Sequence, residues 1–268
     1  MTNLIPMAGL GNRFFQEKYK LPKPFIPVFT TPMFITSVQS FPKADRYIFI
    51  ARQEHSQKYH MAHIVNEAFG KESRIVAIEN PTEGQACTCL LAYDLLDKDD
   101  GLFIASCDYE MVYDKKKYAA LLNDNTIDVI IWTFRIGSIK KANPDAFAYC
   151  RADGIEVQEV VEKRTISDNP FDDPAVVGSF TYKRGELFLR SAQKMIRKNI
   201  RVNGEFYVAT SINELIKEGL RVVTFDIDQF ISFGNPFELQ SVYYWQEFFN
   251  ALEDHPYKVK RFDQKNKN

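Results

Sequence analysis

Two glycines and two basic residues near the start of the chain have the spacing of a phosphate-binding loop. The apolar run 3–8 leads directly into Gly9-Leu10-Gly11-Asn12-Arg13, and a polar loop then reaches Lys23. Glycines let a backbone turn sharply and bring its N–H groups close to an anion, and the two basic side chains would supply charge. A tight turn without a ligand is the alternative that the spacing alone leaves open.

The loop differs from two common phosphate-binding signatures. No third glycine completes GxGxxG, and no Lys-Ser or Lys-Thr pair follows the glycines as it does in a P-loop. We therefore expect neither a Rossmann NAD site nor a Walker-type ATPase.

A single carboxylate follows another apolar run. Asp108 comes directly after Phe103-Ile104-Ala105-Ser106-Cys107, and open α/β sheets collect their ligands at the carboxyl ends of such strands. Because Mg²⁺ prefers oxygen ligands and commonly takes only one or two protein carboxylates, Asp108 is a candidate magnesium ligand. A carboxylate that only caps the next segment is the alternative.

The alternation of short apolar runs with amphipathic stretches predicts the elements that would position these residues. It indicates an α/β fold whose mainly parallel sheet is covered on both faces. We expect strands at 3–8, 46–51, 75–78, 102–106 and 129–135 and helices at 31–41, 53–69, 85–96 and 118–122. Strand-like runs at 147–151, 155–162 and 175–182 follow without long crossovers and predict an antiparallel excursion. Helices at 185–198, 208–217 and 236–252 and a strand at 222–226 complete the pattern.

Composition restricts the classes of function. The chain has 268 residues, and 34 Lys and Arg against 35 Asp and Glu give a net charge of −1, so it lacks the basic field of a general nucleic-acid-binding protein. No apolar run approaches the roughly 18 residues that cross a bilayer, and the N-terminus has no secretory pattern, so we expect a cytoplasmic protein that does not bind membranes. We expect the four cysteines to be reduced and mostly buried.

The stretch Pro6 to Phe14, with Leu21 to Val28 and Pro32-Met33, resembles the signature of the nucleotidyltransferases that make nucleotide sugars. The resemblance implies a Rossmann-like, GT-A type three-layer sandwich in which the glycine-rich loop holds a nucleoside triphosphate. It also implies that the arginine assists the departing pyrophosphate and that the lysine contacts the phosphates. These expectations fall on Ala8, Gly9, Leu10 and Gly11 as nucleotide-binding residues, on Arg13 and Lys23 as catalytic residues, and on Asp108 as the ligand of Mg²⁺.

Further segments resemble the same family. Asn80-Pro81-Thr82-Glu83-Gly84 is similar to its base-contacting loop, which implies that Asn80 and Gly84 contact the nucleotide. The pair Glu162-Lys163 resembles the family's Glu-Lys pair, with the glutamate on the acceptor and the catalytic lysine on its phosphate. Gly178 and Glu205 lie in two more segments that resemble acceptor-side segments. Each segment also has a plain structural alternative, a capped helix or a surface salt bridge.

The resemblance extends to the segment Phe233 to Leu239 and therefore covers about residues 4 to 240, but one position departs from the family pattern. Many members have an Asp two residues before the last glycine that completes a metal site, whereas Ser232 stands here. Asp226 or Asp228 could compensate, catalysis could be impaired, or the metal could be held by Asp108, phosphates and water. We favour the last of these.

The resemblance implies one domain, residues 1–255, with a nucleotide-binding part at 1–140, an acceptor-binding part at 141–255 and a polar tail at 256–268. The expected reaction transfers a nucleoside monophosphate from a triphosphate to a phosphorylated sugar or another phosphorylated small molecule, releasing pyrophosphate, for glycan or capsule precursors. Two alternatives remain: a GT-A glycosyltransferase using Asp108-Tyr109-Glu110, and a catalytically impaired nucleotide-binding regulatory protein. The sequence leaves the nucleotide, the acceptor and the oligomeric state open.

Overall fold

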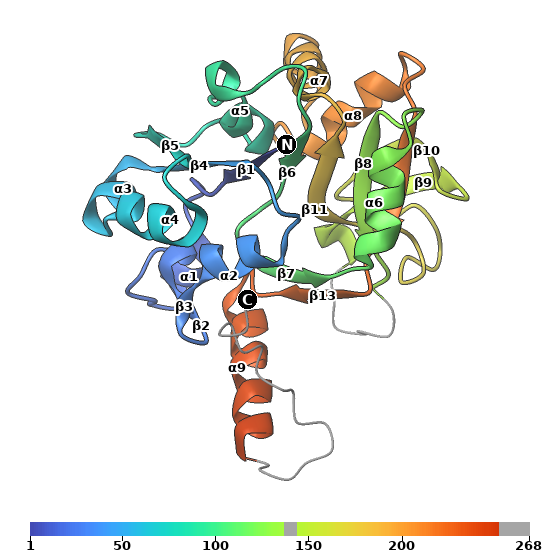
Figure 1. Ribbon diagram of the computed structural model, residues 1–268. Helices are drawn as coiled ribbons and strands as arrows, with labels where there is room; N and C mark the ends of the chain where they lie inside the picture. The colour runs from blue at the N-terminus through green and yellow to red at the C-terminus, as the bar shows by residue number, and fades with distance from the viewer. Residues whose placement is uncertain (137–143, 252–268) are drawn as a thin grey trace.

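A nine-stranded sheet organises the protein, and a computed structural model describes residues 1–136 and 144–251 of it (Figure 1). The strands of this sheet follow the order β5-β4-β1-β6-β11-β8-β12-β10-β9. The strands are β1 (Thr2–Pro6), β2 (Pro27–Val28), β3 (Thr31–Pro32), β4 (Arg46–Arg52), β5 (Arg74–Ile78), β6 (Leu102–Ile104), β7 (Tyr109–Val112), β8 (Val129–Phe134), β9 (Ala148–Asp153), β10 (Glu156–Glu162), β11 (Ala175–Tyr182), β12 (Val222–Asp226) and β13 (Gln229–Ser232).

Helices fill the connections between these strands. The α-helices are α1 (Asn12–Gln16), α2 (Met33–Ser40), α3 (Gln53–Lys58), α4 (Met61–Phe69), α5 (Gln85–Leu90), α6 (Lys115–Asn123), α7 (Gly185–Arg197), α8 (Val208–Ile216) and α9 (Pro236–Ala251). Short 3-10 turns are η1 (Lys23–Phe25), η2 (Tyr93–Leu95) and η3 (Pro144–Ala146).

The sheet is mixed. Strands β5, β4, β1 and β6 are parallel, and β12 is parallel to β8, as the βα alternation predicts. The expected antiparallel excursion is present at one edge of the sheet, where β9 and β10 pair. Its third strand, β11, lies elsewhere than expected, because it inserts between β6 and β8 in the middle of the sheet. All its residues except Gly178 are buried, which suits a strand covered on both faces. The sequence pattern identifies such a strand but not its neighbours.

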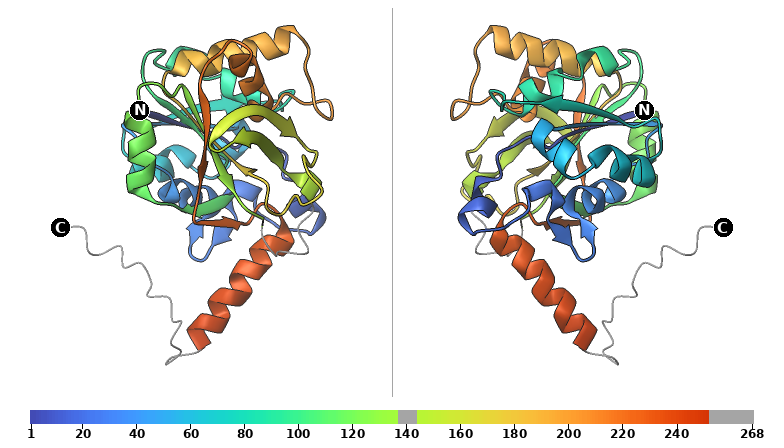
Figure 2. Two further views of the ribbon diagram at one scale, coloured as in Figure 1. Left: turned by 90° about the vertical axis from the view of Figure 1, so that its right-hand side faces the viewer. Right: turned by 90° about the vertical axis from the view of Figure 1, so that its left-hand side faces the viewer.

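Two cores make the fold a three-layer sandwich. Alternate residues of β1 point to opposite faces of the sheet, so Leu4 packs with α5, α7 and α8 while Ile5 packs with α2, α4 and α6. Figure 2 shows the sheet between these helices. The four cysteines are free, and all but Cys87 are buried, as expected.

The predicted elements are present, with differences at particular points. The helix expected at 53–69 is interrupted at His60, whose φ of 48° is left-handed, and becomes α3 and α4. The two-residue pair β2–β3 and the short helix α1 were not expected. The division at residue 140 and the tail at 256–268 lie outside the described residues.

A second, two-stranded sheet pairs β7 with β13 in antiparallel register, so that Tyr109 faces Ser232 and Val112 faces Gln229. It was not expected from the sequence, and it brings the closing segment of the chain beside Asp108. Helix α9 then extends away from the sheet (Figure 2). No helix within residues 1–136 and 144–251 is long and apolar enough to cross a membrane.

Helix α8 is fixed to α7 by a buried carboxylate. The Glu214 side chain is 1% exposed, and its oxygens lie 2.6 Å from Lys198 Nζ and 3.0 Å from Lys217 Nζ. Burial alone would raise the pKa of Glu214, but the two ammonium groups lower it to about 2. A carboxyl group with a lowered pKa stabilises the fold at pH values above its unfolded pKa, and this stabilisation is lost as the pH falls toward 2.

We therefore predict that Glu214→Gln lowers the free energy of unfolding by about 1 to 3 kcal/mol at pH 7, and that the difference from wild type shrinks as the pH falls below about 4. Urea unfolding at pH 7 and pH 3 measures both values. Glu218→Gln is the control, because this more exposed partner of Lys194 should cost under about 1 kcal/mol. A deficit for Glu214→Gln that is the same at both pH values would contradict the account.

Candidate functional site

The glycine-rich loop turns at Gly11 and passes against Lys23. Gly11 has a left-handed φ of 64°, and a Cβ on it would lie 3.2 Å from Lys23 Cβ. The Gly11 carbonyl accepts hydrogen bonds from the backbone N–H groups of Phe14 and Phe15, which start α1. Gly9 has no atom within 4 Å of where its Cβ would be. The backbone conformation thus favours a glycine at position 11, and the structure leaves open space beside position 9.

Lys23 and Asp108 form an ion pair at the centre of this region. Lys23 Nζ lies 2.5 Å from Asp108 Oδ2, and the two side chains are 17% and 19% exposed. Burial alone would raise the pKa of the Asp108 carboxyl, but the Lys23 ammonium and, at longer range, the Arg13 guanidinium hold that pKa below its usual range. The structure therefore brings together Arg13, Lys23 and Asp108, three residues that the sequence analysis selected as site residues.

The closing segment of the chain completes this cluster. The Phe233 N–H donates to the Asp108 carbonyl at 3.0 Å, and the Phe233 ring packs in a small core with Phe14 and Leu239. A Cβ on Gly234 would lie 2.8 Å from Asp108 Oδ2, so a larger residue there would displace the Asp108 carboxylate. Arg13 and Asn235 line a cavity of about 320 Å³ beside it. Residues of the first loop and of the closing segment, far apart in the sequence, thus lie in one site.

The predicted base-contacting loop is joined to the acceptor side. Gly84 has a φ of 131°, and a Cβ on it would lie 2.5 Å from the Phe206 backbone nitrogen. The Phe206 N–H donates to the Glu83 carbonyl at 2.9 Å, and the Ala86 N–H donates to the Phe206 carbonyl at 3.0 Å. Gly84 is therefore required for close backbone packing. Asn80 is exposed in the loop before it, and contacts of these two residues with a base stay a prediction.

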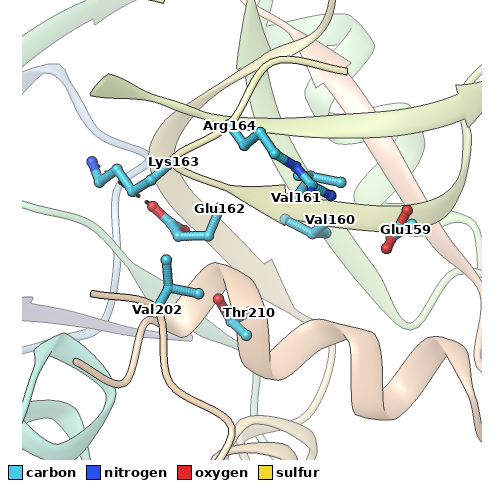
Figure 3. A pocket seen from close by; sticks show the side chains of 8 residues that line it. All are labelled: Glu159, Val160, Val161, Glu162, Lys163, Arg164, Val202 and Thr210. Atoms are coloured by element: carbon cyan, nitrogen blue, oxygen red, sulfur yellow. Dashed lines mark ion pairs between the residues drawn. The ribbon is translucent and has the colours of Figure 1, made fainter. Parts of the chain in front are cut away.

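Glu162 is the last residue of β10 and Lys163 follows it, and both line a cavity of about 390 Å³ (Figure 3). The Glu162 side chain is 6% exposed and lies 3.8 Å from Lys163 Nζ. Burial raises the pKa of Glu162 to about 7, Lys163 opposes this shift, and Glu205 adds to it. Glu162 and Glu205 are thus close enough to interact. The left-handed residues Asn203 and Gly204 make the tight turn that presents Glu205.

Helix α8 holds β10 in place. The Asn213 side chain donates to the Val160 carbonyl and accepts from the Val160 N–H, both at 2.8 Å, so it substitutes for a neighbouring strand. Thr210, one turn earlier, lines the cavity with Glu162. The Thr210 hydroxyl is buried and has no hydrogen-bond partner within the described ranges, 1–136 and 144–251. It is therefore an unsatisfied polar group in the wall of the cavity.

Gly178, the remaining predicted site residue, lies between the Lys23–Asp108 cluster and the acceptor-side strands. Gly178 has a φ of 97°, and a Cβ on it would lie 3.8 Å from the Tyr109 ring. The Tyr109 hydroxyl shares a 2.5 Å hydrogen bond with Ser179. Since Tyr109 follows Asp108 directly, β11 connects the carboxylate of the first cluster with the acceptor-side strands.

Sequence reasoning missed some residues of the site. Thr210, Asn213 and Glu238 were not selected, because each stands in an ordinary amphipathic helix pattern or, for Glu238, in a helix start. Glu238 had a usable signal. It forms Asn-Pro-x-Glu with Asn235, the pattern of a capped helix start that is anchored in space.

The raised pKa of Glu162 makes a prediction about stability. A carboxyl group with a raised pKa ionises first in the unfolded chain, so it reduces stability as the pH rises from about 4.5 to about 7. We expect Glu162→Gln to gain stability relative to wild type over this interval, by up to roughly 3 kcal/mol. Urea unfolding at pH 5 and pH 8 tests this. Glu159→Gln, on an exposed part of the same strand, should show no such change, and parallel pH profiles for wild type and Glu162→Gln would refute the assignment.

Comparison with known proteins gives matches only at the level of structure. No protein-family model matches the chain, and no curated protein matches its sequence. A nucleoside-diphosphate-sugar pyrophosphorylase from Vibrio cholerae RC9 superposes with a TM-score of 0.74 at 23% identity, covering 90% of this chain and 98% of that one. A putative glucose-1-phosphate thymidylyltransferase from Bacillus anthracis gives 0.72 at 18%, covering 91% and 95% of the two chains. The inositol-1-phosphate CTP transferase from T. maritima gives 0.70 at 12%, covering 94% and 96%.

These matches confirm the resemblance at the level of the fold. Over about 90% of its length, the chain therefore has the fold of the nucleoside-diphosphate-sugar pyrophosphorylases and sugar-phosphate nucleotidyltransferases.

Proposed function

We propose that this chain is a nucleotidyltransferase that transfers a nucleoside monophosphate from a triphosphate to a phosphorylated small molecule and releases pyrophosphate. A sugar phosphate is the first candidate acceptor, because sugar-phosphate enzymes are prominent among the structural matches. The product would then serve as a glycan or capsule precursor. The observation that carries the proposal is the meeting of Lys23, Asp108 and Arg13 under the glycine-rich loop.

The proposed chemistry needs no general base. An oxygen of the acceptor's phosphate attacks the α-phosphorus, a new P–O bond forms, and the bond from the α-phosphorus to the bridging oxygen breaks so that pyrophosphate leaves. A phosphomonoester has its second pKa near 6 and is already largely a dianion at neutral pH. The obstacle is repulsion between two polyanions, which cationic groups in fixed positions reduce.

The cationic residues of the site would divide this work. Backbone groups of Ala8 to Gly11 would hold the triphosphate, Lys23 would bind its phosphates, and Arg13 would stabilise charge on the departing pyrophosphate. Lys163 would bind the acceptor's phosphate; its ammonium lies over the Tyr207 ring, 5.7 Å from the centroid. Each group acts by position and charge rather than by proton transfer.

Asp108 is the residue proposed to hold Mg²⁺. The residues present fit the ion, since the carboxylate supplies the oxygen donors that it prefers and the missing Cβ of Gly234 leaves space beside Oδ2. Bound there, the ion would offset negative charge on the phosphates. Lys23 already pairs with this oxygen, so the ion would have to take the place of its ammonium there.

Acceptor recognition would use the cavity at the end of β10. Glu162 and Glu205 would accept hydrogen bonds from acceptor hydroxyls, Gly178 would leave room for the acceptor, and the free hydroxyl of Thr210 offers one more polar contact. Asn80 and Gly84 would contact the base. These residues would suit a polar acceptor, but they do not specify which one.

We predict that Lys23→Ala folds but loses about 10²- to 10³-fold in turnover, the usual cost of removing one electrostatic contact of this kind. The assay is a matrix of the four nucleoside triphosphates against candidate sugar and alcohol phosphates, read out as pyrophosphate. Lys43→Ala is the matched control, because Lys43 is exposed and precedes β4, at the N-terminal ends of the parallel strands, whereas Lys23 lies beyond their C-terminal ends.

Turnover of Lys23→Ala equal to that of wild type would refute the assignment of Lys23. Release of a nucleoside diphosphate from a nucleotide sugar, without pyrophosphate, would support the glycosyltransferase alternative. Nucleotide binding without turnover across the whole matrix would support the regulatory one.

A further inference from the structure

Glu238 faces the same small space as Asp108. If Gly234 carried a Cβ, this atom would lie 2.8 Å from Asp108 Oδ2 and 3.6 Å from Glu238 Oε2. Two carboxylates from distant parts of the chain therefore pack against the same glycine. Since neighbouring like charges repel, the arrangement favours a cation beside them, and the Lys23 ammonium already takes this place at Asp108 Oδ2.

Glu238 is held in this orientation from two sides. The Ser232 hydroxyl donates to Glu238 Oε2 at 2.7 Å, and the Glu238 backbone N–H donates to Asn235 Oδ1 at 3.0 Å at the start of α9. Ser232 is fixed in turn by its pairing with Tyr109 across the β13–β7 sheet. The carboxylate of Glu238 is therefore held relative to Asp108 through the strand that follows Asp108.

The two other acids considered for this role lie elsewhere. Asp226 accepts hydrogen bonds from Thr133 at 2.5 Å and Arg135 at 2.9 Å, at the end of β12 and β8. Asp228 is exposed, and its backbone N–H bonds to the Val112 carbonyl, at the end of β7 remote from Asp108. Neither carboxylate is placed beside Asp108 as Glu238 is.

We infer that Glu238 is the second protein carboxylate for the divalent cation of this site and that Ser232 is its positioning residue. The inference rests on the proposed function and deepens it. Position 232, where the resembled family has an aspartate, here carries a hydroxyl that holds the longer glutamate six residues later. No group of three or more His, Cys, Asp or Glu that could hold a metal exists in the part of the chain that the structure describes. Two carboxylates completed by phosphate oxygens and water match the usual coordination of Mg²⁺.

Binding of Mn²⁺ in the presence of inorganic pyrophosphate tests this inference without a turnover assay. Electron paramagnetic resonance measures the free Mn²⁺ in titrations of wild type, Glu238→Gln, Asp108→Asn and Ser232→Ala. We expect Glu238→Gln to weaken Mn²⁺ binding about tenfold or more, Asp108→Asn to do the same, and Ser232→Ala to give a smaller loss. Asp228→Asn, the matched control, should bind as wild type does, and circular dichroism and thermal unfolding confirm that each variant is folded.

The outcomes separate this inference from the proposed function. If Asp108→Asn weakens binding and Glu238→Gln does not, Glu238 is no ligand and the inference fails while the proposed function stands. If wild type binds no Mn²⁺, or Asp108→Asn binds it as tightly as wild type, the metal assignment to Asp108 fails and this inference fails with it. Wild-type affinity in Ser232→Ala would overturn the positioning role of that residue.

Discussion

The ion pair between Lys23 and Asp108 is the interaction on which the proposed site depends. Each side chain is less than one-fifth exposed, and a carboxylate removed from water to this extent needs a cationic partner. The pair also joins the loop after β1 to the loop after β6, two neighbouring parallel strands. The same ion pair therefore neutralises the Asp108 carboxylate and fixes the loop after β1 in place. A bound polyanion would meet a lysine that is already held at the strand ends.

The rest of the fold holds distant segments against this pair. The β7–β13 sheet brings the closing segment to Asp108, and Phe233 packs against Phe14 from the first loop. On the acceptor side, Gly84 allows the backbones of residues 83–86 and 206 to bond directly. These contacts use backbone groups, a glycine and apolar side chains, so they fix positions while leaving the charged side chains available.

The sequence predicted the elements and several of the grouped charges, since both depend on local signals. Apolar periodicity identified the strands and helices, and the glycine spacing with the resemblance selected Lys23 and Asp108, which the structure pairs. Long-range pairing carries no such signal. The central position of β11 and the pairing of Ser232 with Tyr109 depend on contacts between strands far apart in the chain. For Glu238 the local pattern marks only a helix start, and the β13 pairing that turns this glutamate toward Asp108 has no local signal.

The central claim is that the first loop, with Lys23, recognises the phosphate chain of a nucleotide. The most direct measurement is calorimetric titration of the wild-type protein, with Mg²⁺, by each nucleoside triphosphate and by the nucleoside of the same base. The account predicts that at least one triphosphate binds much more tightly than its nucleoside, because the phosphates supply the contacts. Equal affinities for triphosphate and nucleoside, or no binding of any triphosphate, would contradict it.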